Sequence, residues 1–266
     1  DRLQACVARA LVEAQLLELD PAEAASLRRA SAAYLAARFT GEPRCDDDDD
    51  AGSGESEASP FDLQRPLRGA DWLHRLDAQR AGGRGTFVFD MWQFARQRTW
   101  EGRDLRASPD LLEAIDRALA LTHDELPRIA AQIADARALE GLDTPPKRIA
   151  QGALPAFEPP REVGLLGSTF VRVHLDSPQP GARMRVWARA RGGRFALAAT
   201  KLDAHGAVIA RIEAGSWHAP TSQLSVELDD RTAAVLISAT NVGDGTPDFD
   251  APSEPAEVTL TVDLAR

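Results

Sequence analysis

The chain has 266 residues, 44% of them hydrophobic, and a formal net charge of −10 at pH 7. This length and composition allow one large domain or two ordinary ones with a real core. The acidic balance argues against partners that need a basic surface, namely nucleic acid and anionic membranes. No stretch approaches the ~18 consecutive apolar residues that a membrane span requires.

The first 40 residues show the 3.6-residue period of helices. A first helix is predicted from Arg2 to Leu19. The apolar residues on one of its faces are Leu3, Val7, Ala10, Ala14 and Leu17. Asp20 as N-cap and Glu23 three residues later predict a capping box at the start of a second helix, which Gly41 ends. These two helices form a predicted helical hairpin.

Cys6 and Cys45 are the only two cysteines, and they bracket this hairpin. In an oxidising compartment they can form one disulfide, stabilising the fold by roughly 4 kcal/mol on the chain-entropy model. Two unpaired buried thiols are the alternative. The chain opens at Asp1 rather than Met, so we expect that a targeting segment or a larger upstream part has been removed.

The stretch from Thr86 to Trp100 is the most apolar helical segment of this half. Phe87, Phe89 and Phe94 widen its apolar surface beyond one stripe, which predicts a central helix covered on several sides. Further helices are expected around Trp72, after a cap at Ser108, and near residues 125–139. This half therefore predicts an all-α domain of about six helices.

Two segments of the chain have a strongly biased composition. Residues 46–60 hold five consecutive aspartates with Gly, Ser and Glu, which predicts a solvated acidic loop; the alternative, a calcium site, lacks EF-hand spacing. Residues 144–162 hold five prolines and predict a semi-rigid linker. The predicted domains are therefore 1–143, helical, and 163–266.

After the linker the hydrophobic period changes to 2, as in β-strands with one wet face. The predicted strands are 169–175, 183–189, 195–202, 207–213, 224–228, 234–240 and 258–264. Short strands at this spacing favour an antiparallel β-sandwich. The predicted fold class is α+β multidomain, an N-terminal all-α helical domain followed by a C-terminal antiparallel β-sandwich.

No HExxH, GxSxG, P-loop or placed GxGxxG motif is present, so the sequence carries no recognisable catalytic motif. Asp244, Asp248 and Asp250 share one predicted loop, where their oxygens could gather around Ca²⁺, the one cofactor considered. Turn chemistry alone also explains them. No calcium-dependent stabilisation is expected, because regular ligand spacing is absent.

Four residues of one predicted strand form a second candidate site: Arg183, Arg185, Trp187 and Arg189. They could bind a carboxylate-rich or glycan ligand through ion pairs and stacking. A solvated outer face of the sheet is the simpler interpretation.

The stretches AAYLAARFTG and FVFDMWQFARQRTWEG, followed by LISATNVGDGTPDFD, resemble the region of secreted bacterial zinc peptidases that follows the catalytic helix. The predicted sandwich resembles the β-modules appended to such peptidases. The family's HExxH motif is absent, so no zinc ligand or general base is carried over to this chain.

These observations favour a non-catalytic accessory, binding or assembly module of a peptidase-like protein, exported to the periplasm, cell surface or medium. One alternative is the C-terminal part of a secreted zinc peptidase whose catalytic helix precedes Asp1. Another is a structural subunit of a surface assembly that makes contact through apolar strips on the first helices. The expected partner is another protein or the upstream part of the same precursor.

Overall fold

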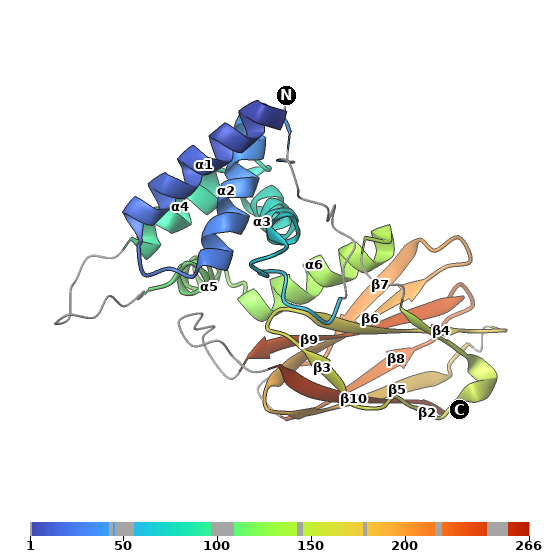
Figure 1. Ribbon diagram of the computed structural model, residues 1–266. Coiled ribbons are helices and arrows are strands. Elements are labelled where there is room, and N and C mark those ends of the chain that lie inside the picture. The colour runs from blue at the N-terminus through green and yellow to red at the C-terminus, as the bar shows by residue number, and fades with distance from the viewer. Residues whose placement is uncertain are drawn as a thin grey trace. The chain divides into compact units, whose positions relative to one another are not determined.

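The computed structural model describes residues 2–42, 45, 56–96, 109–142, 146–177, 180–215, 220–243 and 255–265. The chain divides into two compact units, a helical unit that includes Pro60–Ile129 and a β unit that includes Ala130–Gly245. Helices occupy the N-terminal half and two sheets the C-terminal half, which confirms the predicted fold class (Figure 1). Among the described residues, no helix is both long and apolar enough to cross a membrane.

In the described part of the N-terminal half, the helices follow one another without an intervening strand. They are α1 (Arg2–Leu19), α2 (Ala25–Thr40), α3 (Pro66–Ala81), α4 (Thr86–Ala95), α5 (Leu111–Ala120) and α6 (Leu126–Glu140). The core of the helical unit includes Leu27, Leu73, Leu76, Trp92 and Ile115, all fully buried. The predicted disulfide joins Cys6 to Cys45.

Helix α1 has the predicted bounds, but its predicted apolar face points to solvent. Ala5, Val12 and Leu16 are buried instead, whereas Leu3 is 68% exposed and Leu17 47%. Both sides of α1 are apolar, so periodicity could not decide which side packs against the helical unit.

The predicted capping box at Asp20 and Glu23 is wrong, because α2 begins only at Ala25. The carboxylate of Glu23 accepts hydrogen bonds from the backbone N–H groups of Ala24, at 2.8 Å, and Leu111, at 2.7 Å. Glu23 thus stabilises the start of α5 from a distant part of the sequence. Burial raises its pKa to about 7.

Helix α4 receives the same kind of support from Asp77 of α3. The fully buried Asp77 carboxylate accepts from the backbone N–H groups of Gly85 and Phe87, at 2.9 and 3.0 Å. The prediction that α4 is covered on several sides is wrong, because Phe89 is 48% and Phe94 65% exposed. Helix α5 begins at a capping box of Asp110 and Glu113, and the predicted cap Ser108 lies outside the described residues.

The β unit contains two sheets. The strands are β1 (Lys147–Ala150), β2 (Ala156–Phe157), β3 (Arg161–Val163), β4 (Ser168–His174), β5 (Arg183–Arg191), β6 (Arg194–Leu202), β7 (Val208–Glu213), β8 (Thr221–Glu227), β9 (Ala234–Gly243) and β10 (Ala256–Ala265). The first sheet has the order β1-β4-β9-β6-β7, and the second β2-β10-β5-β8, with β3 also paired to β10. Apart from the parallel pair β1 and β4, the described strand pairs are antiparallel.

The core of the β unit lies between the two sheets, where residues such as Val173 and Ile237 of the first sheet join Val186 and Val262 of the second. The wet outer face predicted for β4 is wrong. Helix α6 lies over this face of the first sheet (Figure 1). Its Ala134 packs there against Phe170, with Leu202 and Leu236. We call the outer face of the first sheet, which carries these residues, the covered face.

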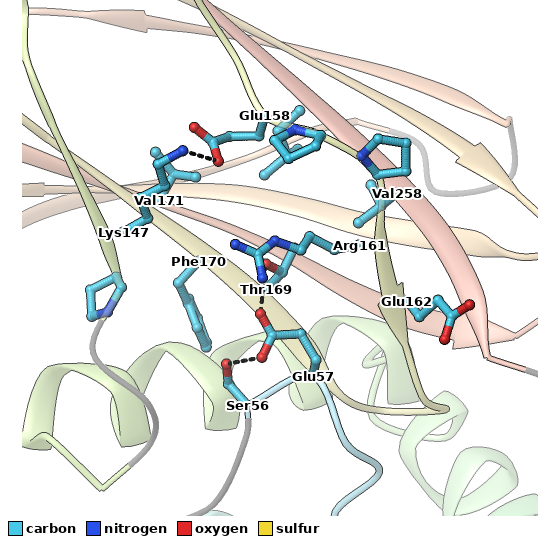
Figure 2. Close-up of a pocket in the computed structure, with 14 residues that line it drawn as sticks. Ser56, Glu57, Lys147, Glu158, Arg161, Glu162, Thr169, Phe170, Val171 and Val258 are labelled. Carbon is cyan, nitrogen blue, oxygen red and sulfur yellow. Dashed lines mark hydrogen bonds and ion pairs between the residues drawn. The ribbon is translucent and has the colours of Figure 1, made fainter.

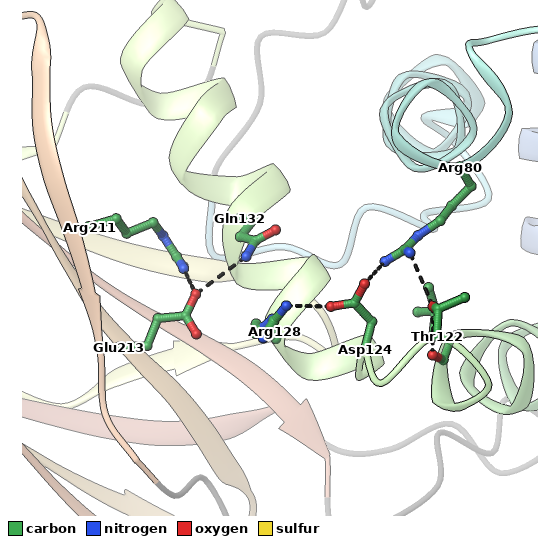
Figure 3. Close-up of polar contacts among 8 residues, drawn as sticks. Arg80, Thr122, Asp124, Arg128, Gln132, Arg211 and Glu213 are labelled. Atoms are coloured by element: carbon green, nitrogen blue, oxygen red, sulfur yellow. Dashed lines mark hydrogen bonds and ion pairs between the residues drawn. The ribbon is translucent and has the colours of Figure 1, made fainter.

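Polar contacts also tie α6 to the covered face. Asp135, 4% exposed, accepts a hydrogen bond from Nε of Arg211 at 2.6 Å. Burial raises the pKa of Asp135, although the Arg211 guanidinium opposes the shift. Figure 3 shows Gln132 and Arg211 both directed at Glu213.

Figure 3 also shows an ion-pair cluster within the helical unit, where Asp124 lies between Arg80 and Arg128. These two arginines hold the pKa of Asp124 below its usual value.

Residues predicted as loop and linker contribute to the β unit. Residues 46–55 of the acidic loop lie outside the described residues, but the carbonyl of Glu57 accepts from the N–H of Gly164 at 2.7 Å. A Cβ at Gly167 would lie 2.4 Å from that same carbonyl oxygen, so glycine is required there. Strands β1, β2 and β3 lie largely within residues 144–162. The division into domains at 1–143 and 163–266 stays a prediction.

Candidate ligand-binding surfaces

The outer face of the second sheet, which we call the open face, carries the predicted Arg and Trp cluster. Strand β5 alternates as predicted: Met184 and Val186 are buried, while Arg183, Arg185 and Arg189 are exposed and Trp187 is partly exposed. Other side chains of this face include Arg191 of β5, Phe157 of β2, Thr221, Gln223, Ser225 and Glu227 of β8, and Glu257, Thr259, Thr261 and Asp263 of β10.

The strand register brings two aromatic residues into one row across the open face. Thr261 of β10 lies directly opposite Phe157 on one side and Trp187 on the other, and Gln223 lies opposite Trp187. Directly opposed residues project from the same face of a sheet. Phe157 is 67% exposed. Phe157 was not predicted as a site residue, because it lies among the prolines of the predicted linker, where no strand pattern is visible.

The arginines of the open face have acidic cross-strand neighbours. Arg183 lies opposite Glu227, and Arg185 lies opposite Asp263. Arg191 lies opposite Glu257, with 3.9 Å between their charged groups. Arg189 instead lies between Thr221 and Thr259. The acidic residues therefore offset most of the positive charge that the sequence pattern suggested.

A separate cleft of about 580 Å³ is lined by residues of β1 and β4 from the first sheet and of β3 and β10 from the second (Figure 2). Its volume falls within the range of ligand pockets, ~300–1,000 Å³. Val171 of the first sheet and Val258 of the second contribute to its lining. At its rim, Nζ of Lys147 lies 2.7 Å from the carboxylate of Glu158. The hydroxyl of Thr169 donates to Glu57 at 3.2 Å.

These rim groups bind one another, so they do not form a convergent set directed at a ligand. Arg161 also points toward Glu57 in this view. The polar groups at the rim of the cleft therefore stabilise the fold, and the open face is the candidate ligand site.

The predicted calcium residues Asp244, Asp248 and Asp250 lie outside the described residues. Within the described ranges, no group of three or more His, Cys, Asp or Glu side chains could hold a metal ion. The calcium hypothesis thus stays untested.

No protein-family model matches the chain, and no curated protein matches it. Among solved structures, the enzymatically active domain of tailspike protein 4 from bacteriophage CBA120 is 11% identical, with a TM-score of 0.27. The match covers 40% of this chain and 15% of that one.

Two similar structures are matched over nearly their whole length. The pre-peptidase C-terminal domain of a Bacillus anthracis collagenase is 9% identical, with a TM-score of 0.29, over 46% of this chain and 97% of that one. A family 6 carbohydrate-binding module is 10% identical, with a TM-score of 0.21, over 45% of this chain and 98% of that one. A C-terminal domain of a collagenase is thus among the structures to which this chain is similar.

Proposed function

We propose that the chain is an exported accessory binding module and that its open face binds a carbohydrate chain. The proposal rests on one observation, the alignment of exposed Phe157 and partly exposed Trp187 in a single row of the open face. Two strand spacings separate these residues, or ~10 Å. An extended chain lying across the strands would therefore meet both aromatic side chains.

The chemistry of this row suits sugars. The C–H groups on the face of a pyranose ring are apolar and can pack on an aromatic ring, while the ring's hydroxyl groups need hydrogen-bond partners. Thr261 lies between Phe157 and Trp187, and Gln223 continues the row. Their side chains offer donors and acceptors at the edge of the aromatic platform.

The pairing of arginines with acidic residues on the open face indicates which kind of glycan it could bind. The three arginines that lie opposite acidic residues are Arg183, Arg185 and Arg191, so the face does not present a strongly positive field. Arg189, with threonines on both sides, is the arginine best placed to hydrogen-bond a hydroxyl or a single carboxylate. We therefore propose a neutral or sparsely charged glycan rather than a densely anionic one.

The disulfide supports export, because disulfides persist mainly in oxidising compartments. A β-domain that binds polysaccharide would keep an associated enzyme close to a wall or matrix by raising its local concentration there. A peptidase is the enzyme that the sequence resemblance suggests. That partnership, like the alternative that this chain is the C-terminal part of such an enzyme, is part of the proposal.

Affinity electrophoresis against soluble polysaccharides, with isothermal titration of oligosaccharides from those that bind, tests the proposal. The panel should include β-glucan, xylan and mannan as neutral chains and polygalacturonate as an anionic one. Trp187→Ala should weaken binding by about fivefold, because losing one stacked aromatic side chain costs on the order of 1 kcal/mol. The double variant with Phe157→Ala should abolish measurable binding.

The matched control is Phe39→Ala, since Phe39 is 80% exposed but belongs to α2 of the helical unit. It should bind as the unaltered chain does. Binding to a neutral chain should change little between low and moderate salt. Failure to bind any polysaccharide in the panel, or binding that survives the double variant, would refute the proposal.

A further inference from the structure

Three cationic side chains lie at one edge of the covered face. Arg148 of β1 lies directly opposite Arg172 of β4, and His174 follows two residues later on β4. The residues that alternate with them, Ile149 and Val173, point into the core between the sheets. The side chains of Arg148, Arg172 and His174 therefore project from the outer face. We call these three residues the cationic edge.

The cationic edge lacks the acidic neighbours that most arginines of the open face have. Like charges directly opposite each other destabilise a sheet, and on the open face Arg183 accordingly lies opposite Glu227. Arg172 instead has Arg148 on one side and Leu236 on the other. Within the described ranges, no side chain of the cationic edge makes a hydrogen bond or a salt bridge. No such contact therefore offsets the repulsion between the two arginines.

The surroundings of the cationic edge are only partly wet. Arg172 and His174 are half-buried beside the apolar cluster that α6 covers. Nε of Arg172 and Nε2 of His174 are shielded from solvent and have no hydrogen-bond partner among the described residues. Burial lowers the pKa of His174, and the guanidinium groups of Arg172 and Arg148 lower it further, against the opposing charge of Asp176. An anion is attracted more strongly to such a place than to a fully solvated surface.

We infer that the cationic edge binds a phosphate or sulfate group. The two arginines lie one strand spacing apart, ~4.8 Å, so their guanidinium groups can donate to different oxygens of one tetrahedral anion. A carboxylate has only two oxygens, which a single guanidinium fork satisfies, so it would leave the second arginine unpaired. A tetrahedral dianion neutralises both. The site lies on the other sheet from the open face, so it does not depend on glycan binding.

Isothermal titration with sodium sulfate and with inorganic phosphate, at constant ionic strength, tests the inference. Either anion should bind more tightly than acetate. Arg148→Gln should weaken the binding of both by about tenfold, because one charge-assisted contact is lost. Thermal melts should show the same contrast. Sulfate also stabilises folded proteins without binding to a site, so the decisive quantity is the difference between the unaltered chain and the variant.

Two further variants separate binding from folding. Arg183→Gln is the matched control, since Arg183 is an exposed arginine of the second sheet, and it should bind both anions as the unaltered chain does. Arg172→Lys keeps the positive charge but not the fork, so it should lose part of the affinity. Arg148 is exposed, and without added anion Arg148→Gln should be at least as stable as the unaltered chain, because it removes the repulsion.

Glucose 6-phosphate distinguishes a free anion from an esterified group. Tighter binding of the ester than of inorganic phosphate would assign the site to a phosphorylated sugar, and weaker binding would assign it to the free anion. Sulfate and phosphate affinities no greater than that for acetate would overturn the inference. Equal responses of the unaltered chain and Arg148→Gln to these anions would overturn it as well.

Discussion

The two outer faces of the β-sandwich differ in what covers them: α6 packs on one, and the other is open to solvent. The covered face carries Phe170, Leu202 and Leu236 beneath α6, and one of its charged residues, Arg211, is paired with Asp135. The open face alternates arginine, threonine and acidic residues, yet it also holds Phe157 and Trp187.

The exposure of an aromatic side chain on each face shows whether it stabilises the fold or is available to bind a ligand. Phe170 is 5% exposed and fills the space between helix and sheet, so the fold depends on it. Phe157 is 67% exposed and fills no core position. An aromatic side chain exposed in this way is suited to contact with a bound ligand, as in the proposed glycan complex.

The largest expected effect comes from comparing these two phenylalanines. Phe170→Ala should lower the free energy of unfolding by about 3–5 kcal/mol, through lost burial and the cavity it leaves. Phe157→Ala should change it by less than ~0.5 kcal/mol, because its side chain is already in water. Urea denaturation of both variants measures the contrast. Equal losses would mean that Phe157 also belongs to a packed interface.

Breaking the buried ion pair of the covered face should have the next largest effect. Asp135→Ala leaves Arg211 paired with Glu213 of its own strand but no longer with α6, and should cost about 3 kcal/mol. The control on the open face is Asp263→Ala, because facing charges on an exposed sheet face, such as Asp263 opposite Arg185, contribute under ~1 kcal/mol. A loss below ~1 kcal/mol for Asp135→Ala as well would show that water reaches the space beneath α6.

Buried and exposed carboxylates can also be compared through pH, using Glu23 of the helical unit. Its pKa is about 7 in the folded chain and 4.5 in the reference state, so the folded chain holds more protons between these values. Stability should therefore fall as pH rises from 5 to 8, by roughly 2 kcal/mol from this residue.

Glu23→Gln removes this titration, so its stability should lose that part of the pH dependence. The variant should also be less stable at pH 5, because a single amide oxygen replaces the carboxyl group that bonds Ala24 and Leu111. Thermal melts of both proteins across this range measure the effect. Parallel stability curves for the two proteins would show that Glu23 titrates normally in the folded chain.

The smallest effect on stability is expected at Arg189, which has only threonines across the strands. Arg189→Ala should change the free energy of unfolding by less than ~0.5 kcal/mol while weakening glycan binding. Denaturation and affinity electrophoresis on one preparation would measure both. A stability loss with unchanged binding would assign Arg189 to the fold rather than to the site.

Local patterns in the sequence predicted the helices, most strands and the disulfide. The predicted first helix matches α1 at both ends, and the alternation of Arg183, Met184 and Arg185 predicted the two sides of β5. Contacts between distant segments could not be predicted this way. The hydrogen bond from Leu111 to Glu23 and the packing of Ala134 on Phe170 depend on how elements meet, which period and capping rules do not encode.

Only part of the candidate site could be predicted, because the rest depends on contacts between distant segments. Trp187 stood out within its strand, but its alignment with Phe157 depends on the register of β2, β10 and β5. The two-residue strand β2 is too short to show a period, and its neighbours are prolines. Register across three strands is a tertiary property, so the sequence alone offered an Arg and Trp cluster rather than an aromatic row.

Amide chemical-shift mapping with cellohexaose and xylohexaose tests the central claim most directly. If the open face binds glycan, the shifts that change on titration should cluster on β2, β10, β5 and β8, centred on Phe157, Thr261 and Trp187. The indole N–H of Trp187 should move with the same affinity. Shifts confined to the covered face or to the cleft lined by Lys147 and Glu158, with the open face unchanged, would contradict the account.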